Sequence, residues 1–111
     1  MSLSPRRHGI PKRLKPHKLL QYVKPQYEQL LLTYQSLKTE AEELLDAGKT
    51  LSNELEKSLL AVKDEAISLA DEIEERATSM DGIIRKELLE MSENLRKIPI
   101  FIDELFERKK K

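Results

Sequence analysis

An apolar stripe constrains this chain more than any other feature of its sequence. Between Tyr27 and Ile98, apolar side chains recur in steps of three and four residues, with an interruption near Gly48. Such steps place side chains on one face of an α-helix, and the positions between them hold mainly Glu, Lys, Asp, Ser and Gln. A helix with one continuous apolar face has to bury that face. The sequence therefore predicts long amphipathic helices that pack against one another or against another chain.

The large aliphatic members of the stripe are the residues that we expect to form the helix-packing interface. They are Leu30, Leu37, Leu44, Leu55, Leu59, Val62, Leu69, Ile73, Ile84, Leu88 and Leu95. The stripe repeats about every 3.5 residues before Gly48, as in a left-handed coiled coil, and about every 3.6 residues after it, as in a straight amphipathic helix. We therefore expect the two parts to pack differently, and another chain to complete the stripe.

The helical region spans residues 25–98 and contains one expected turn, at residues 46–50. Gly48 is suited to the left-handed conformation that often ends a helix, and Thr50 or Ser52 can cap the helix that follows. With this single turn, the chain forms an elongated helical hairpin with a long second arm. This all-α, coiled-coil-type arrangement is the fold that we expect.

A second break at residues 78–82 is the alternative. Thr78 and Asp81 have the spacing of a helix start, and Gly82 weakens a continuous helix. Met80, however, lies on the stripe and favours a helix that continues through this point. If both glycines mark turns, the chain forms a compact three-helix bundle.

Residues 1–24 form a basic segment with prolines at positions 5, 11 and 16, which oppose a regular helix. We expect an extended, flexible arm. It contains no acidic residue, whereas residues 27–75 hold thirteen acidic and four basic residues. Cations without acids bind polyanions in a salt-dependent way, so an acidic protein surface or a nucleic acid is the expected partner. The arm could instead dock on the acidic middle of its own chain. The expected polyanion-binding residues are Arg6, Arg7, Lys12, Arg13, Lys15 and Lys18, and Ser4, which precedes a proline and two arginines, is a candidate phosphorylation site.

Residues 99–111 begin with a proline, which we expect to kink or end the preceding helix. A short apolar and aromatic helix and a lysine-rich tail follow. Phe101, Ile102, Leu105 and Phe106 form a candidate C-terminal anchor for a groove on a protein partner. A membrane surface is the less favoured partner, because acidic residues lie among the apolar ones. In the remaining alternative, the segment folds back onto the bundle.

The sequence offers little for catalysis. It has no cysteine, which excludes disulfides and zinc–thiolate sites, and both histidines, His8 and His17, lie in the basic arm. A glycine-rich phosphate-binding loop is missing, and no apolar run reaches the roughly 20 residues that span a bilayer. We therefore expect a non-enzymatic intracellular protein, cytoplasmic or nuclear, without a metal or cofactor.

These features together predict a non-catalytic helical subunit of a larger multiprotein assembly. The helices would act as a scaffold or adaptor by packing with other helical chains, in a homo- or hetero-oligomer, and the basic arm would contact an acidic partner. The alternative is a nucleic-acid-binding protein whose arm carries the function and whose helices form a dimerisation module.

Overall fold

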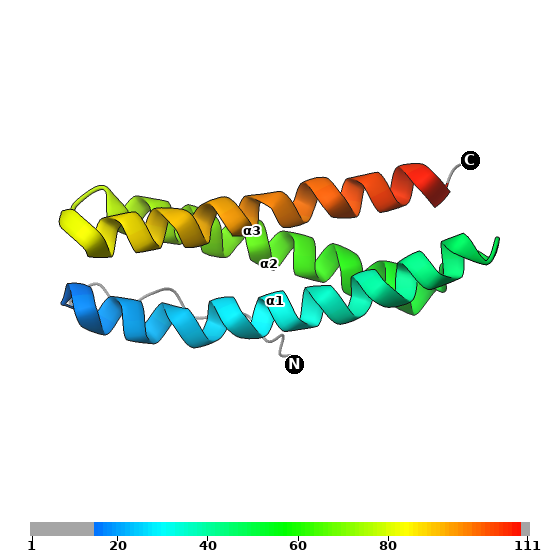
Figure 1. Ribbon diagram of the computed structural model, residues 1–111, viewed down its shortest axis with the longest axis horizontal. Helices are drawn as coiled ribbons and strands as arrows, with labels where there is room; N and C mark the ends of the chain where they lie inside the picture. The colour runs from blue at the N-terminus through cyan, green and yellow to red at the C-terminus, as the bar shows by residue number, and fades with distance from the viewer. Residues whose placement is uncertain (1–14, 110–111) are drawn as a thin grey trace, which may run out of the picture.

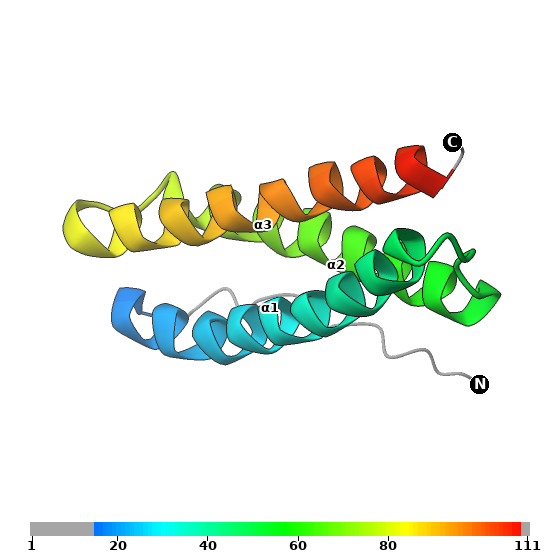
Figure 2. The same ribbon diagram turned by 45° about the vertical axis from the view of Figure 1, so that its right-hand side comes forward.

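The computed structural model describes residues 15–109, which form three α-helices: α1 (Pro16–Asp46), α2 (Asn53–Ala77) and α3 (Gly82–Lys109). The helices lie side by side and alternate in direction, so that α2 runs opposite to α1 and α3 (Figures 1 and 2). The described residues contain no strand. This arrangement confirms the predicted all-α bundle. It is also somewhat elongated, since the 31 residues of α1 form a rod about 46 Å long.

The turn between α1 and α2 lies where the sequence predicts it. Gly48 has φ of +75°, and its N–H donates to the Leu45 carbonyl (3.0 Å), while the Lys49 N–H donates to the Leu44 carbonyl (2.8 Å). These two bonds are those of a Schellman motif, which satisfies carbonyls at the end of a helix. Ser52 then caps α2, because its side-chain oxygen accepts the Leu55 N–H at 3.1 Å.

A second turn, at residues 78–81, corrects the expectation of one continuous helix after residue 51. α2 ends at Ala77, and Gly82 has φ of +71°, a left-handed conformation that costs a residue with a Cβ atom about 1–2 kcal/mol. The hydroxyl of Thr78 donates to the Glu75 carbonyl (2.7 Å) and helps to close the last turn of α2. The three-helix alternative is therefore the arrangement found.

Both expected boundaries at prolines are also corrected, because Pro25 and Pro99 lie inside helices. α1 begins at Pro16, where the first helical turn needs no N–H from the proline. Residues 16–24, which were expected to form an extended arm, are therefore part of α1. Residues 99–109 are part of α3. A proline inside a helix costs about 3 kcal/mol, whereas burying each large aliphatic side chain contributes about 1.5–3 kcal/mol.

That burial occurs on both sides of each internal proline. Leu19 and Val23 are fully buried ahead of Pro25, and Ile98 and Ile102 are buried on either side of Pro99. Core packing therefore outweighs the helix-breaking tendency of both prolines.

The apolar faces of the three helices meet in one core. α2 and α3 pack most closely against each other, and α1 lies against both. Leu59, Leu69 and Ile73 from α2 are fully buried in this core, as are Leu88 and Leu95 from α3. The stripe is therefore covered within a single chain.

Replacing Gly82 tests the second turn. A Cβ added at Gly82 would meet no atom within 4 Å, so Gly82→Ala should lose about 1 kcal/mol of unfolding free energy through backbone strain alone. Gly82→Asn should lose less, because asparagine tolerates the left-handed conformation. Chemical unfolding followed by circular dichroism measures both. Equal stability of the Ala variant, the Asn variant and the parent chain would contradict a left-handed residue at this turn.

Candidate functional site

The residues expected to pack against other helices lie within the core of their own chain. Leu37, Leu44 and Ile84 are partly buried against the core. The others are buried: Leu30, Leu55, Leu59, Val62, Leu69, Ile73, Leu88 and Leu95. The expectation that another chain must complete this stripe is corrected, because the turn at residues 78–81 creates a third helix that covers it.

The predicted polyanion-binding residues are only partly described. Lys15 and Lys18 are exposed at the start of α1. The remaining predicted cations, Arg6, Arg7, Lys12 and Arg13, and the candidate phosphorylation site Ser4 lie outside the described residues.

The predicted C-terminal anchor is largely part of the core. Ile102 and Leu105 are buried, Phe106 is half-buried, and Phe101 remains 39% exposed. Of the three possibilities for this segment, folding back onto its own bundle is the one found. Ile102 and Leu105 therefore do not form a free anchor, because continuation of α3 past Pro99 turns them towards the core.

Lys38 joins α1 to α3 through the aromatic ring of Phe101. Its ammonium lies 5.3 Å from the centre of the Phe101 ring and 6.0 Å from that of Tyr34. Burial, followed by the nearby carboxylates of Glu42 and Glu104, raises the pKa of Tyr34 to about 12. The Tyr34 hydroxyl has no hydrogen-bond partner among residues 15–109. This phenol is therefore held neutral and serves mainly as a packing group.

A polar cluster around Arg96 connects α2 with α3. The Arg96 guanidinium contacts both carboxylate oxygens of Glu74, at 2.7 and 3.1 Å, and Asp71 at 2.5 Å. Ser92, which is buried, donates to Glu74 at 2.6 Å. The hydrogen bonds from Arg96 and then Ser92 lower the pKa of Glu74 to about 2, and the bonds to Glu74 and Asp71 raise the pKa of Arg96. Both carboxylate oxygens of Glu74 accept hydrogen bonds from α3, so the evident role of this cluster is structural.

Three polar contacts fix the register of α2 against α3. Lys63 contacts Asp103 at 2.6 Å near one end, while Asp71 faces Arg96 and Glu74 faces Ser92 further along. Each step forward along α2 is thus matched by a step back along α3.

This register places exposed apolar side chains of α2 and α3 at nearby levels along the bundle. Ile67 lies midway between Lys63 and Asp71, so it is level with the part of α3 that contains Ile100. Leu60 lies seven residues before Ile67, on the same face of α2. Leu60 is 46% exposed, Ile100 is 57% exposed and Ile67 is partly exposed. We call these three residues the apolar strip.

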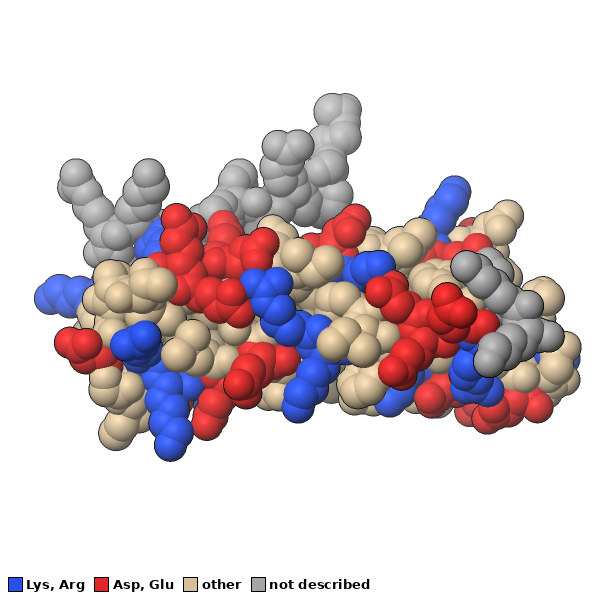
Figure 3. All heavy atoms as spheres, turned by 90° about the horizontal axis from the view of Figure 1, so that it is seen from above, with Lys and Arg blue, Asp and Glu red and all other residues tan. Residues whose placement is uncertain are grey.

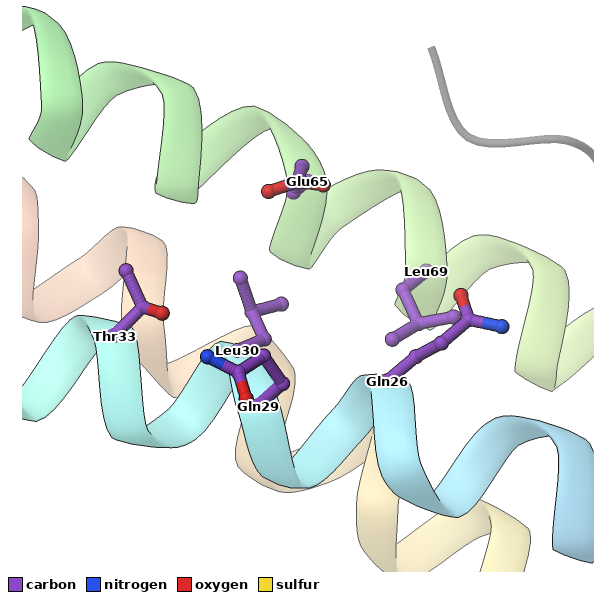
Figure 4. A pocket seen from close by; sticks show the side chains of 6 residues that line it. All are labelled: Gln26, Gln29, Leu30, Thr33, Glu65 and Leu69. Atoms are coloured by element: carbon purple, nitrogen blue, oxygen red, sulfur yellow. The ribbon is translucent and has the colours of Figure 1, made fainter. Parts of the chain in front are cut away.

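A hollow between α1 and α2, here the α1–α2 groove, has a volume of about 230 Å³. It is lined by Gln26, Gln29, Leu30, Thr33, Glu65 and Leu69. Leu30 and Gln26 point from α1 towards α2, and Leu69 points back towards α1 (Figure 4). Gln26 donates from Nε2 to the Tyr22 carbonyl at 3.4 Å, but its buried Oε1 has no partner in the described part of the chain.

Neither the apolar strip nor the α1–α2 groove was predicted. For the groove, the available signal was the spacing of Gln26, Gln29 and Thr33, which places three uncharged polar residues on one face of α1. For the strip, the register of α2 against α3 is needed, and that register depends on a turn whose existence was open.

The rest of the described surface gives no further chemical site. Acidic and basic side chains are interspersed over the face seen in Figure 3, which looks down on α3. No group of three or more His, Cys, Asp or Glu residues within the described range could hold a metal ion. None of the described helices is long and apolar enough to cross a membrane.

The lowered pKa of Glu74 predicts a pH-dependent contribution to stability. Folding lowers this pKa from 4.5 to about 2, so the carboxylate stabilises the fold above about pH 4.5, and this contribution is lost as the pH falls towards 2. Glu74→Gln should therefore be less stable than the parent chain at neutral pH, and the two stability curves should converge between pH 4.5 and 2. Chemical unfolding at several pH values measures this, with the exposed Glu75→Gln as the control. A difference between parent and Glu74→Gln that does not change with pH would rule out this role for Glu74.

Comparisons with protein-family models, with curated proteins and with solved structures find no match for this chain.

Proposed function

We propose that this chain is a non-catalytic subunit of a multiprotein assembly, in which the bundle acts as a scaffold or adaptor and the basic N-terminal arm contacts an acidic partner. The observation that carries the proposal is the apolar strip. It lies outside a core that is already complete, so a partner can cover it without rearranging the bundle.

The composition of the strip suits a protein partner. Its members come from two helices, and the spacing of Leu60 and Ile67 matches the repeat with which a partner helix presents its own apolar side chains. The Lys63–Asp103 ion pair lies beside them and supplies the polar edge that protein interfaces usually have. Covering the strip would contribute about 25 cal/mol for each Å² of apolar surface removed from water.

The charge distribution supports contact between the N-terminal arm and an acidic partner. The first 26 residues carry seven basic and no acidic residues, so this end of the chain favours an acidic surface. The alternative, nucleic-acid binding by the arm with the helices as a dimerisation module, has less support. Its dimerisation module would use stripe residues that are buried within one chain.

Substitutions in the apolar strip test the proposal. The double variant Leu60→Gln, Ile100→Gln should keep the helicity and thermal stability of the parent chain but bind its partner at least about tenfold more weakly, a loss of about 1.4 kcal/mol. The matched control is Leu32→Gln, Ile83→Gln, which alters two other exposed apolar residues. Each tagged chain is isolated from its native cells, and the stoichiometry of every co-purifying protein is measured.

The parent and the control should each retain the same companion in fixed stoichiometry, and the strip variant should lose it. Equal retention by all three chains would remove the apolar strip from the proposal. A parent chain isolated without any stoichiometric companion would contradict the assembly function itself.

A further inference from the structure

The α1–α2 groove contains hydrogen-bond acceptors and apolar side chains close together. The buried Oε1 of Gln26 accepts no hydrogen bond from residues 15–109, and Glu65 lines the same hollow with a carboxylate. Leu30 and Leu69 supply the apolar part (Figure 4). A buried acceptor without a donor is uncommon in proteins. The groove therefore suits an occupant that is rich in hydrogen-bond donors and contains aliphatic side chains.

The surroundings of the groove are acidic. Helical spacing places Glu40 on the same face of α1 as Thr33, seven residues earlier, and Glu72 on the same face of α2 as Glu65. Two of the four basic residues in this part of the chain, Lys38 and Lys63, instead contact residues of α3. Arg76 lies on the same face of α2, four residues after Glu72, so three carboxylates (Glu40, Glu65 and Glu72) face one cation along the α1–α2 groove. This excess of negative charge favours a cationic occupant.

One segment of this chain has the matching composition. Residues 1–14 contain four basic residues and no acidic one, together with three aliphatic side chains, Leu3, Ile10 and Leu14. They join the bundle directly before Lys15, at the start of α1.

The length of this segment also suffices. Gln26 lies eleven residues beyond Lys15, about 16 Å along α1. Fourteen residues span up to about 46 Å, enough to reach the whole groove and continue past Glu40. Because the segment and the groove belong to one molecule, even a weak contact is favoured by a high effective concentration.

From this complementarity we propose that the α1–α2 groove binds residues 1–14 of its own chain. The groove then holds residues 1–14, the part of the basic arm that precedes α1, on the acidic face of the bundle, and an external acidic partner has to compete with the groove for this segment. Competition by an external acidic partner rests on the proposed function of the arm. The docking of residues 1–14 in the groove does not depend on that function. The donors of the segment satisfy Gln26 Oε1 and Glu65, and its aliphatic side chains cover Leu30 and Leu69.

The absence of cysteine makes a direct test straightforward. A spin label attached to the full chain through Ser2→Cys should broaden the NMR signals of the backbone amides of Gln29 and Thr33 far more than that of Lys97 on α3. The broadening should be independent of protein concentration and should decrease as salt is added, because the contact is intramolecular and largely ionic.

Two variants of the labelled chain identify the groove as the binding site. Glu65→Lys should reduce the broadening at Gln29 and Thr33 to the level seen at Lys97, and Gln26→Leu, which removes the unpaired acceptor without changing charge, should reduce it partly. Glu93→Lys makes the same change of charge on exposed α3 and should leave the broadening unchanged. Circular dichroism checks that each variant is folded.

Broadening that is equal at all three amides, or that Glu65→Lys and Glu93→Lys affect alike, would overturn the proposal. Broadening that grows with protein concentration would assign the groove to the arm of a second copy and would overturn it as well. The isolated chain is used throughout, so failure of this test is distinct from failure of the assembly function.

Discussion

Burial of three apolar helix faces in one core is the constraint on which the rest of the structure depends. Gly48 and Gly82 allow this burial within a single chain. Each adopts a positive φ at a turn, so the next helix can return along the previous one. Without the turn before Gly82, a single long helix would leave part of its stripe uncovered. With it, Leu59 and Leu69 on α2 pack in the same core as Leu88 and Leu95 on α3.

Polar contacts add register to this packing. Arg96 with Glu74 and Asp71, together with Lys63 and Asp103, hold α2 and α3 in one alignment. The exposed Lys63–Asp103 and Arg96–Asp71 pairs contribute little free energy each, so their main effect is on alignment, whereas the hydrogen bonds to Glu74 also add pH-dependent stability. That alignment has a consequence at the surface, since it sets the exposed Ile100 of α3 level with Ile67 of α2.

Much of the fold could be predicted from the sequence, because periodicity and glycine chemistry are local signals. The helical stripe, the Gly48 turn and the cap at Ser52 all follow from residues close to one another in the chain. The start of α1 at Pro16 and the continuation of α3 through Pro99 could not be obtained in this way. Pro25 and Pro99 oppose a helix locally, and only burial of Leu19, Val23 and Ile102 in the tertiary core decides the outcome.

The candidate sites were harder to predict for the same reason. Ile67 and Ile100 are level only in the correct register of two helices, and the α1–α2 groove combines Gln26 with Glu65 and Leu69 from another helix. The predicted C-terminal anchor was wrong at Ile102 and Leu105 because an apolar helix end has the same sequence pattern whether it packs inside or outside its own chain.

A bundle that covers its own stripe should fold as a monomer, even if a larger assembly later recruits it. The most direct measurement is the midpoint of thermal unfolding, followed by circular dichroism, over about a hundredfold range of protein concentration. A cooperative transition whose midpoint does not change with concentration is the predicted result. A midpoint that rises with concentration would show that a second chain completes the stripe, and it would contradict the intramolecular core on which this account is based.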